Sequence, residues 1–96
     1  MEQYNSPDEK PWVPILKPRK SGVVAYGKFA VEEYNRSSNA SLEFKSVLQG
    51  AQRKIGGRKY TWLDINTSNG KYRADMYGWG GSKGHKVLIS FNKLNY

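Results

Sequence analysis

The sequence predicts an α+β domain in which one long helix packs across an antiparallel sheet of four to five strands. One segment, from about residue 22 to 37, has apolar residues at three- and four-residue steps, which is typical of an amphipathic helix. After Asn39 the apolar residues alternate with polar ones, which indicates strands, and short turns separate these strands. Strands joined by short turns form an antiparallel sheet, and the helix can bury its apolar side against that sheet.

Length and composition place the chain among small globular domains. It has 96 residues, of which 38% are apolar and 25% charged, and that length suits one domain with a modest core. It contains no cysteine, which excludes disulfides, a cysteine nucleophile and thiolate metal sites. The net charge of +8 favours an acidic partner, although solvated charge with no dedicated partner fits equally well.

The first residues are expected to form a flexible lead, 1–10, ahead of a single domain at 11–96. Residues 12–16 could form a short strand, and the prolines beside it confine that strand to a sheet edge. The polar start of the chain is not a signal peptide, so the protein is expected to be secreted or vacuolar if a leader has been removed and otherwise cytoplasmic. No apolar run approaches the roughly 20 residues that cross a bilayer, so no membrane partner is expected.

The predicted helix has two distinct sides. Its apolar side carries Val23, Gly27, Ala30 and Tyr34, with Tyr26 and Val31 beside them. On the opposite side Glu32 and Arg36 have the i,i+4 spacing of an ion pair. The helix is therefore expected to lie on the sheet with one side down.

Four strands are expected after the helix, at about 42–49, 59–66, 71–77 and 86–92. A turn at 53–58 contains Gly56-Gly57, a turn at 67–70 contains Asn69-Gly70, and a glycine-rich loop spans 78–84. Strict alternation places Leu48 on the same face as Phe44, and Ile89 on the same face as Phe91.

The order of these turns brings three distant segments to one end of the sheet. In a meander, alternate turns lie at the same end, so the 53–58 turn and the 78–84 loop are neighbours. If the first strand pairs antiparallel with the second, the residues before Trp12 emerge at that end as well.

The helix sequence Ala25-Tyr26-Gly27-Lys28-Phe29-Ala30-Val31-Glu32-Glu33-Tyr34-Asn35 closely resembles the signature of plant cystatins, inhibitors of papain-like cysteine proteases. The likeness continues at 11–15, 42–44 and 52–56. The C-terminal half, at 72–75 and 84–92, is similar to monellin, a sweet-tasting plant protein of the same fold. The resemblance covers about residues 11–92 and implies a cystatin-like fold and a monomeric inhibitor that needs no cofactor.

In the cystatin family the N-terminal segment and two hairpin loops form a wedge that fills the protease cleft on both sides of the nucleophilic cysteine. The matching positions here, which the resemblance implies to be protease-binding, are Lys10, Pro11, Gln52, Arg53, Lys54, Ile55, Gly56, Trp79 and Gly80. The alternatives are an ordinary hairpin turn with solvated charges at 52–56 and a tryptophan that covers the open end of the sheet at 79.

The sequence departs from the family pattern at each contact element. Gln52 and Gly56 match the family's Gln-x-Val-x-Gly loop, but Lys54 stands where valine is expected. Burying an unpaired ammonium costs several kcal/mol, although a long side chain can keep its charge in water. The N-terminal glycine pair and the Pro-Trp pair of the second loop are both missing. We therefore expect a weakened or specialised inhibitor.

Other function classes fit parts of the sequence. A non-inhibitory basic binding protein on this scaffold, such as a sweet-taste-receptor ligand or a ligand of another acidic protein surface, suits Lys54 and the missing glycine pair. Basic clusters at 17–20, 53–59 and 83–86 favour nucleic acid, but no RNP-like, KH or helix-turn-helix pattern accompanies them, so nucleic acid is not the expected partner. An enzyme is not expected either, because the single His85 lies in a basic loop and no metal-ligand spacing is present.

Overall fold

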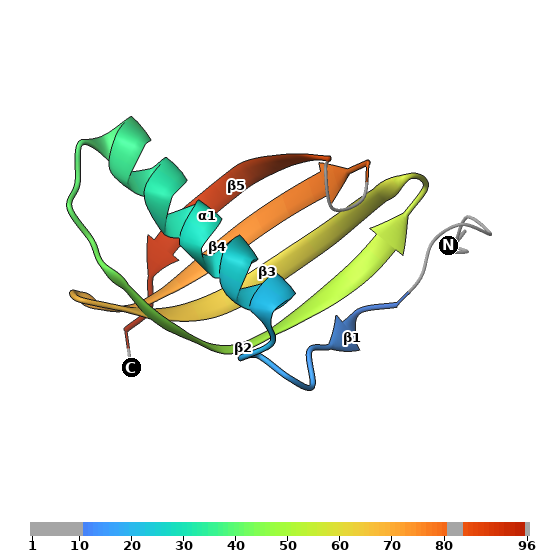
Figure 1. Cartoon of the computed structure of the whole chain (residues 1–96), viewed down its shortest axis with the longest axis horizontal. Coiled ribbons are helices and arrows are strands. Elements are labelled where there is room, and N and C mark those ends of the chain that lie inside the picture. Colours follow the sequence, from blue (N-terminus) through green and yellow to red (C-terminus); the bar gives the residue numbers. More distant parts are fainter. Residues whose placement is uncertain (1–10, 81–83, 96) are drawn as a thin grey trace, which may run out of the picture.

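A computed structural model describes residues 11–80 and 84–95, and in this part of the chain one helix lies across one face of a five-stranded antiparallel sheet (Figure 1). The elements are β1 (Val13–Pro14), α1 (Ser21–Ser38), β2 (Phe44–Ile55), β3 (Arg58–Thr67), β4 (Gly70–Trp79) and β5 (His85–Lys93). The strands lie in the sheet in the order in which they follow in the chain. This is the cystatin-like α+β arrangement that the sequence predicts. The expected flexible lead at 1–10 lies outside the described residues.

The helix begins and ends close to the predicted positions. It ends at Ser38, and the capping residue that follows, Asn39, has a left-handed backbone (φ 54°), which asparagine tolerates better than most residues. The side chain of Asn35 then fixes the path into β2, because its Nδ2 donates to the carbonyl of Leu42 at 2.9 Å and its Oδ1 accepts from the Leu42 N–H at 3.0 Å.

The predicted ion pair on the outer side of α1 is wrong. Arg36 pairs with Glu33, three residues earlier, at 2.5 Å, and not with Glu32. Both spacings bring side chains together on a helix, and an exposed pair contributes only a few tenths of a kcal/mol, so the spacing alone does not decide between them.

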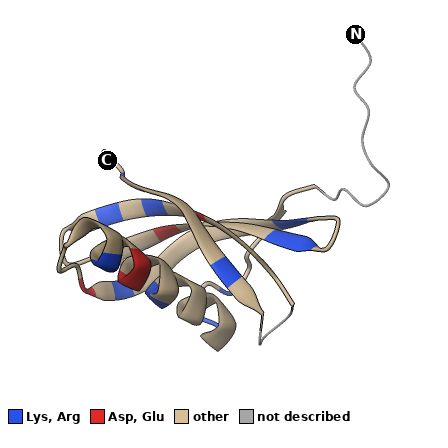
Figure 2. Cartoon of the chain, turned by 90° about the horizontal axis from the view of Figure 1, so that it is seen from above, with Lys and Arg blue, Asp and Glu red and all other residues tan. Residues whose placement is uncertain are grey.

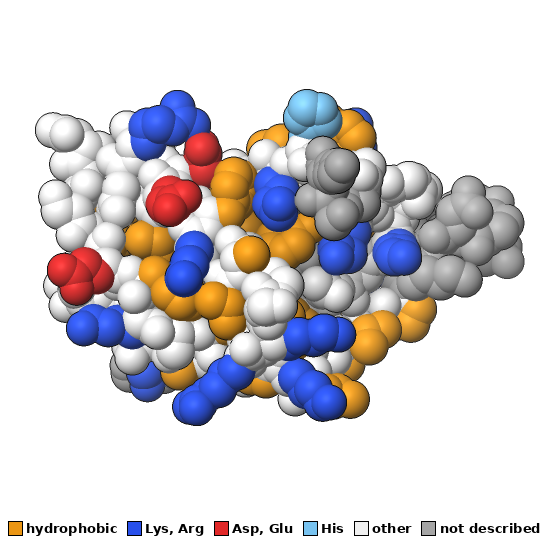
Figure 3. Space-filling model, viewed as in Figure 1, with side chains coloured by type: hydrophobic (Ala, Val, Ile, Leu, Met, Phe, Trp, Pro, Cys, Tyr) orange, Lys and Arg blue, Asp and Glu red, His pale blue; other side chains and the backbone are white. Residues whose placement is uncertain are grey.

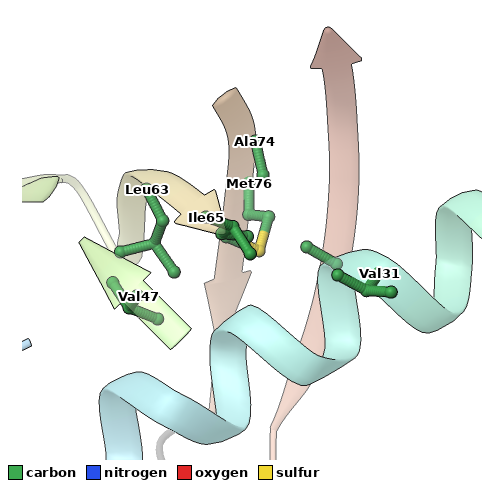
Figure 4. Packing of buried hydrophobic residues seen from close by; sticks show 7 residues of the cluster. Val31, Val47, Leu63, Ile65, Ala74 and Met76 are labelled. Atoms are coloured by element: carbon green, nitrogen blue, oxygen red, sulfur yellow. The ribbon is translucent and has the colours of Figure 1, made fainter. Parts of the chain in front are cut away.

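The core lies between α1 and the sheet. Figure 4 shows Val31 of the helix facing a group of side chains from β2, β3 and β4. The buried cluster, each member at most 3% exposed, comprises Ala30, Val31, Val47, Leu63, Ile65, Ala74 and Met76. Gly27 lets the helix approach closely, because a Cβ there would lie 2.7 Å from Cε1 of Phe44 and 2.9 Å from Cγ2 of Val47.

The expected strict alternation in β2 is wrong. The pairing of β2 with β3 shifts after Phe44 and again after Val47. A shift of one residue moves the side chains that follow to the other face of the sheet. As a result Val47 is buried, whereas Leu48, expected on the same face as Phe44, is 40% exposed.

A similar irregularity corrects the prediction for β5. The pairing with β4 shifts between Asp75 and Met76. Leu88 and Phe91 therefore pack against the core, while Ile89 is left 54% exposed.

The sheet face away from the helix carries an ion pair in which the carboxylate is buried and the arginine side chain is partly exposed. Asp64 is fully buried and accepts hydrogen bonds from Nε and Nη2 of Arg73, at 2.7 and 2.9 Å, and from Gln49 at 2.8 Å. The guanidinium of Arg73 also lies 4.3 Å from the ring centroid of Trp62. Because charge-assisted bonds satisfy the carboxylate, this network joins β2, β3 and β4 on that face without leaving a buried charge unpaired.

Candidate functional site

Three segments far apart in the sequence meet at one end of the sheet, and we call this surface, residues 11–12, 52–58 and 79–80, the loop edge. Val13 lies opposite Gln52, so the residues before Val13 run toward the β2–β3 hairpin. Lys59 lies opposite Gly78, which brings the end of β4 beside the same hairpin. Figure 1 shows the start of the described chain, the β2–β3 turn, the end of β4 and the start of β5 at the same end. The predicted convergence is confirmed for the described residues, and the predicted contact residue Lys10 lies outside them.

The β2–β3 hairpin forms a longer arm than the sequence indicates. Its strands continue to Ile55 and Arg58, so the turn consists of Gly56 and Gly57 rather than all of 53–58. Gly56 has φ +60°, which favours glycine, and a Cβ at either glycine would meet nothing within 4 Å. The tip of this arm therefore stands free of the rest of the described chain.

The predicted contact residues of this arm differ in exposure. Lys54 is exposed, so its ammonium lies in water rather than in the protein, and Gly56 is exposed as well. Gln52, Arg53 and Ile55 are half-buried. The most accessible side chain on the arm before the turn is thus the one that departs from the cystatin pattern.

Each side of the loop edge carries an exposed tryptophan beneath an arginine. Trp12 is 42% exposed, and the guanidinium of Arg53 lies 5.5 Å from its ring centroid. Trp79, which ends β4 instead of lying in the loop, is 41% exposed and has the guanidinium of Arg58 at 5.8 Å. Cation–π contacts of this kind attract a cation to a ring face and help to hold both side chains in place.

Trp79 is also braced by its neighbours. It stacks on Tyr77 with ring centroids 5.8 Å apart, and the exposed His85 ring of the adjacent strand β5 lies at 5.3 Å. A large aromatic side chain that is both exposed and held in one position is the kind of residue that dominates protein–protein binding.

On the helix side of the loop edge the surface forms a hollow of about 750 Å³, which we call the basic hollow. Its polar lining includes Lys20, Tyr26, Gln52, Lys54, Arg58, Lys59 and Lys86. Figure 2 shows basic residues side by side in the β2–β3 hairpin, and in Figure 3 the acidic side chains visible on this face all lie on the half away from the loop edge.

Two lysines of the basic hollow make cation–π contacts with the same tyrosine ring. The ammonium groups of Lys59 and Lys86 each lie 5.2 Å from the ring centroid of Tyr26. Burial, and then the positive charges of Lys54 and Lys86, lower the pKa of Lys59. Burial raises the pKa of Tyr26, because it disfavours the phenolate.

Most of the loop edge is predictable from the sequence, and part of it is not. Trp12 is not among the predicted contact residues, although an aromatic residue between Pro11 and a short edge strand is a signal that could identify it. The positions of Tyr26 and Lys86 beside Lys59 are also missed, because these residues come from α1, β5 and β3 and meet only in the folded chain.

No group of three or more His, Cys, Asp or Glu side chains that could hold a metal ion occurs within 11–80 and 84–95. No helix in those ranges is long and apolar enough to cross a membrane. What the loop edge does present is a set of exposed aromatic and cationic side chains, with the half-buried amide of Gln52 beside them.

Two similarities to known proteins bear on this surface. The family described as aspartic acid proteinase inhibitor matches residues 17–94, which include α1 and β2 to β5. A protein of Arabidopsis thaliana named cysteine proteinase inhibitor 5 is 39% identical over 49 residues, which are 51% of this chain and 40% of that protein. The match thus spans well under half the length of this relative. Both similarities agree with a plant cystatin-like family.

Proposed function

Because this chain belongs to the aspartic acid proteinase inhibitor family, we propose that it inhibits proteases by placing the loop edge in their active-site cleft. The observation that carries the proposal is the convergence of three segments at one end of the sheet, with Trp12 and Trp79 exposed on either side of a free hairpin tip. A projecting edge with fixed aromatic residues suits a concave partner, since buried aromatic anchors supply much of the energy of such interfaces.

The charge of the edge favours an aspartic protease as the target. The catalytic site of that class holds two carboxyl groups that share a proton, so its cleft offers negative charge. Lys54 is exposed near the tip, and Arg58 lies just beyond the turn. In such a cleft their charges meet a complementary group, whereas a cleft shaped for valine at position 54 would require an ammonium to be buried unpaired.

A cysteine protease is the second candidate target, and a different observation favours it. Gln52 and Gly56 keep the positions of the cystatin loop, and the Arabidopsis relative is named for cysteine proteinase inhibition. Lys54 could then extend along the cleft wall and keep its ammonium in water. The two targets therefore differ in what they require of Lys54.

Titration against one protease of each class tests the proposal. The protein is added to pepsin at acid pH and to papain at neutral pH, and circular dichroism at each pH checks that it is folded. We expect inhibition of pepsin at submicromolar concentration. Lys54→Val should weaken that inhibition by about tenfold, equivalent to about 1.4 kcal/mol, and should strengthen inhibition of papain.

The control is Lys45→Val, which removes an exposed lysine from the opposite end of the same strand and should change neither titration. If papain were inhibited and pepsin were not, the target class would be cysteine proteases rather than aspartic proteases. If neither protease were inhibited at tens of micromolar, the inhibitory function would be refuted for both, and a non-inhibitory binding protein on this scaffold would be the better explanation.

A further inference from the structure

The basic hollow collects more positive charge than the fold itself requires. Five cations line it, from the start of α1, both strands of the β2–β3 hairpin and the edge strand β5. They are Lys20, Lys54, Arg58, Lys59 and Lys86. Among the described residues no carboxylate forms an ion pair with any of the five.

Several of these cations contact aromatic rings rather than acids. Lys59 and Lys86 approach the ring of Tyr26 at 5.2 Å each, and Arg58 lies 5.1 Å from the ring centroid of Tyr77. A cation–π contact at a partly exposed site contributes about 0.5–1 kcal/mol, and it leaves the positive charge itself uncompensated. Burial is the largest cause of the lowered pKa of Lys59, and repulsion by the neighbouring ammonium groups adds to it. A bound anion would relieve this repulsion.

The rest of the lining adds to the preference for anions. Lys20 and Gly22, at the start of α1, border the hollow, and the first turn of the helix has no acidic residue and no side-chain cap. The positive end of the helix dipole therefore faces this region without a neutralising group. Val23 and the ring of Tyr26 supply an apolar surface between the cations.

We propose that the basic hollow binds a compact polyanion, a small molecule that carries several phosphate or sulfate esters. The volume of about 750 Å³ is that of a small-molecule site. Its cations come from different elements of the fold, so a ligand with several anionic groups engages more of them than a single anion does. Lysine, a compact point charge with rotatable donors, suits such esters and places few demands on their orientation.

The test measures binding to the full-length protein in the absence of any protease, so its failure and the failure of the proposed inhibition are separate results. Inositol hexakisphosphate serves as the phosphate probe and sucrose octasulfate as the sulfate probe. Calorimetry at physiological salt gives affinity and stoichiometry, and Trp79, which lines the hollow, offers a fluorescence signal. We expect one molecule bound per chain with micromolar affinity, and the tighter probe identifies the ester that the site prefers.

A matched pair of double variants separates a site from general attraction to a protein of net charge +8. Lys59→Gln/Lys86→Gln removes the two lysines beside Tyr26, and Lys28→Gln/Lys45→Gln removes two exposed lysines that do not line the hollow. Both variants lose the same net charge. We expect the first to weaken binding by about tenfold or more and the second by about twofold or less.

Equal weakening by both double variants, several probe molecules bound per chain, or no binding of either probe would overturn the proposal. Changes in the amide chemical shifts of the unmutated protein on addition of a probe give a second measurement, which does not depend on whether any variant folds. Changes confined to the start of α1, the β2–β3 hairpin and the start of β5 support the site. Changes scattered over all basic surfaces contradict it.

Discussion

Replacing Gly27 with alanine should destabilise the protein, although alanine is the better helix former. A Cβ at this position would lie 2.7 Å from Cε1 of Phe44 and 2.9 Å from Cγ2 of Val47, both closer than side chains normally approach. Gly22, in the first turn of the same helix, has nothing within 4 Å of its Cβ position. The two glycines therefore separate helix propensity from close packing against β2.

The expected magnitudes follow from these two environments. Alanine gains about 0.8–1 kcal/mol over glycine inside a helix and less near the end, so Gly22→Ala should stabilise by about 0.5 kcal/mol. Overpacking a well-packed site costs about 1–3 kcal/mol. Because Val47 is only 3% exposed and Phe44 is half-buried, neither can move without disturbing the core, and Gly27→Ala should have a net cost of about 1–2 kcal/mol.

Urea unfolding of the two single variants measures both effects, and unchanged m-values would show that the transitions remain comparable. For a domain of this size about 1 kcal/mol corresponds to a shift of about 4–8 °C in Tm, so thermal unfolding gives an independent reading. If Gly27→Ala were as stabilising as Gly22→Ala, Phe44 and Val47 would have adjusted at no cost. The inference that α1 needs a glycine at position 27 to pack closely against β2 would then be refuted.

Three further predictions concern the core, the helix end and the basic hollow. Leu63→Ala, at a fully buried position, should cost about 3–5 kcal/mol in urea unfolding, and a cost below about 1 kcal/mol would show that the cluster repacks. Asn35→Ala removes both hydrogen bonds to Leu42 and should cost about 1–2 kcal/mol, while Asn35→Asp, which keeps the acceptor, should cost less. The pKa of Lys59 is lower in the folded protein than its ordinary value of 10.5, so just below pH 10.5 the unfolded chain binds more protons at this residue than the folded chain does. The contribution of Lys59 to the free energy of unfolding should therefore rise as the pH rises toward 10.5. Lys59→Met should remove that part of the pH dependence and stabilise the protein at neutral pH; an unchanged slope in unfolding measured across a pH series would refute this account.

Much of the fold could be predicted because local signals agree with one another. The helix is marked by its apolar stripe, and the hairpins by Gly56-Gly57 and Asn69-Gly70, whose backbone requirements hold in any context. The exposure of Leu48 and Ile89 could not be predicted in the same way. Alternation identifies a strand but does not show where one extra residue interrupts it, since bulges are set by how the strand packs against its neighbours.

The candidate site could likewise be predicted only in part. Its position at one end of the sheet follows from strand order alone, so the sequence suffices to place residues 52–56 and Trp79 together. It does not suffice for the basic hollow, because Tyr26 looks in the sequence like one more apolar residue of the helix stripe. Only the docking of α1 on the sheet shows that its ring lies beside both Lys59 and Lys86.

The free tip of the β2–β3 hairpin has a consequence for how a chain of this kind changes over generations. Gly57 has open space around its Cβ position and Lys54 is exposed, so many substitutions there would leave the core as stable as before. Under the proposed function, selection for a new target can act on the tip, while selection for folding acts on the helix and sheet. Similarity to proteins named for inhibiting both aspartic and cysteine proteinases is what such independent adaptation of tip and scaffold permits.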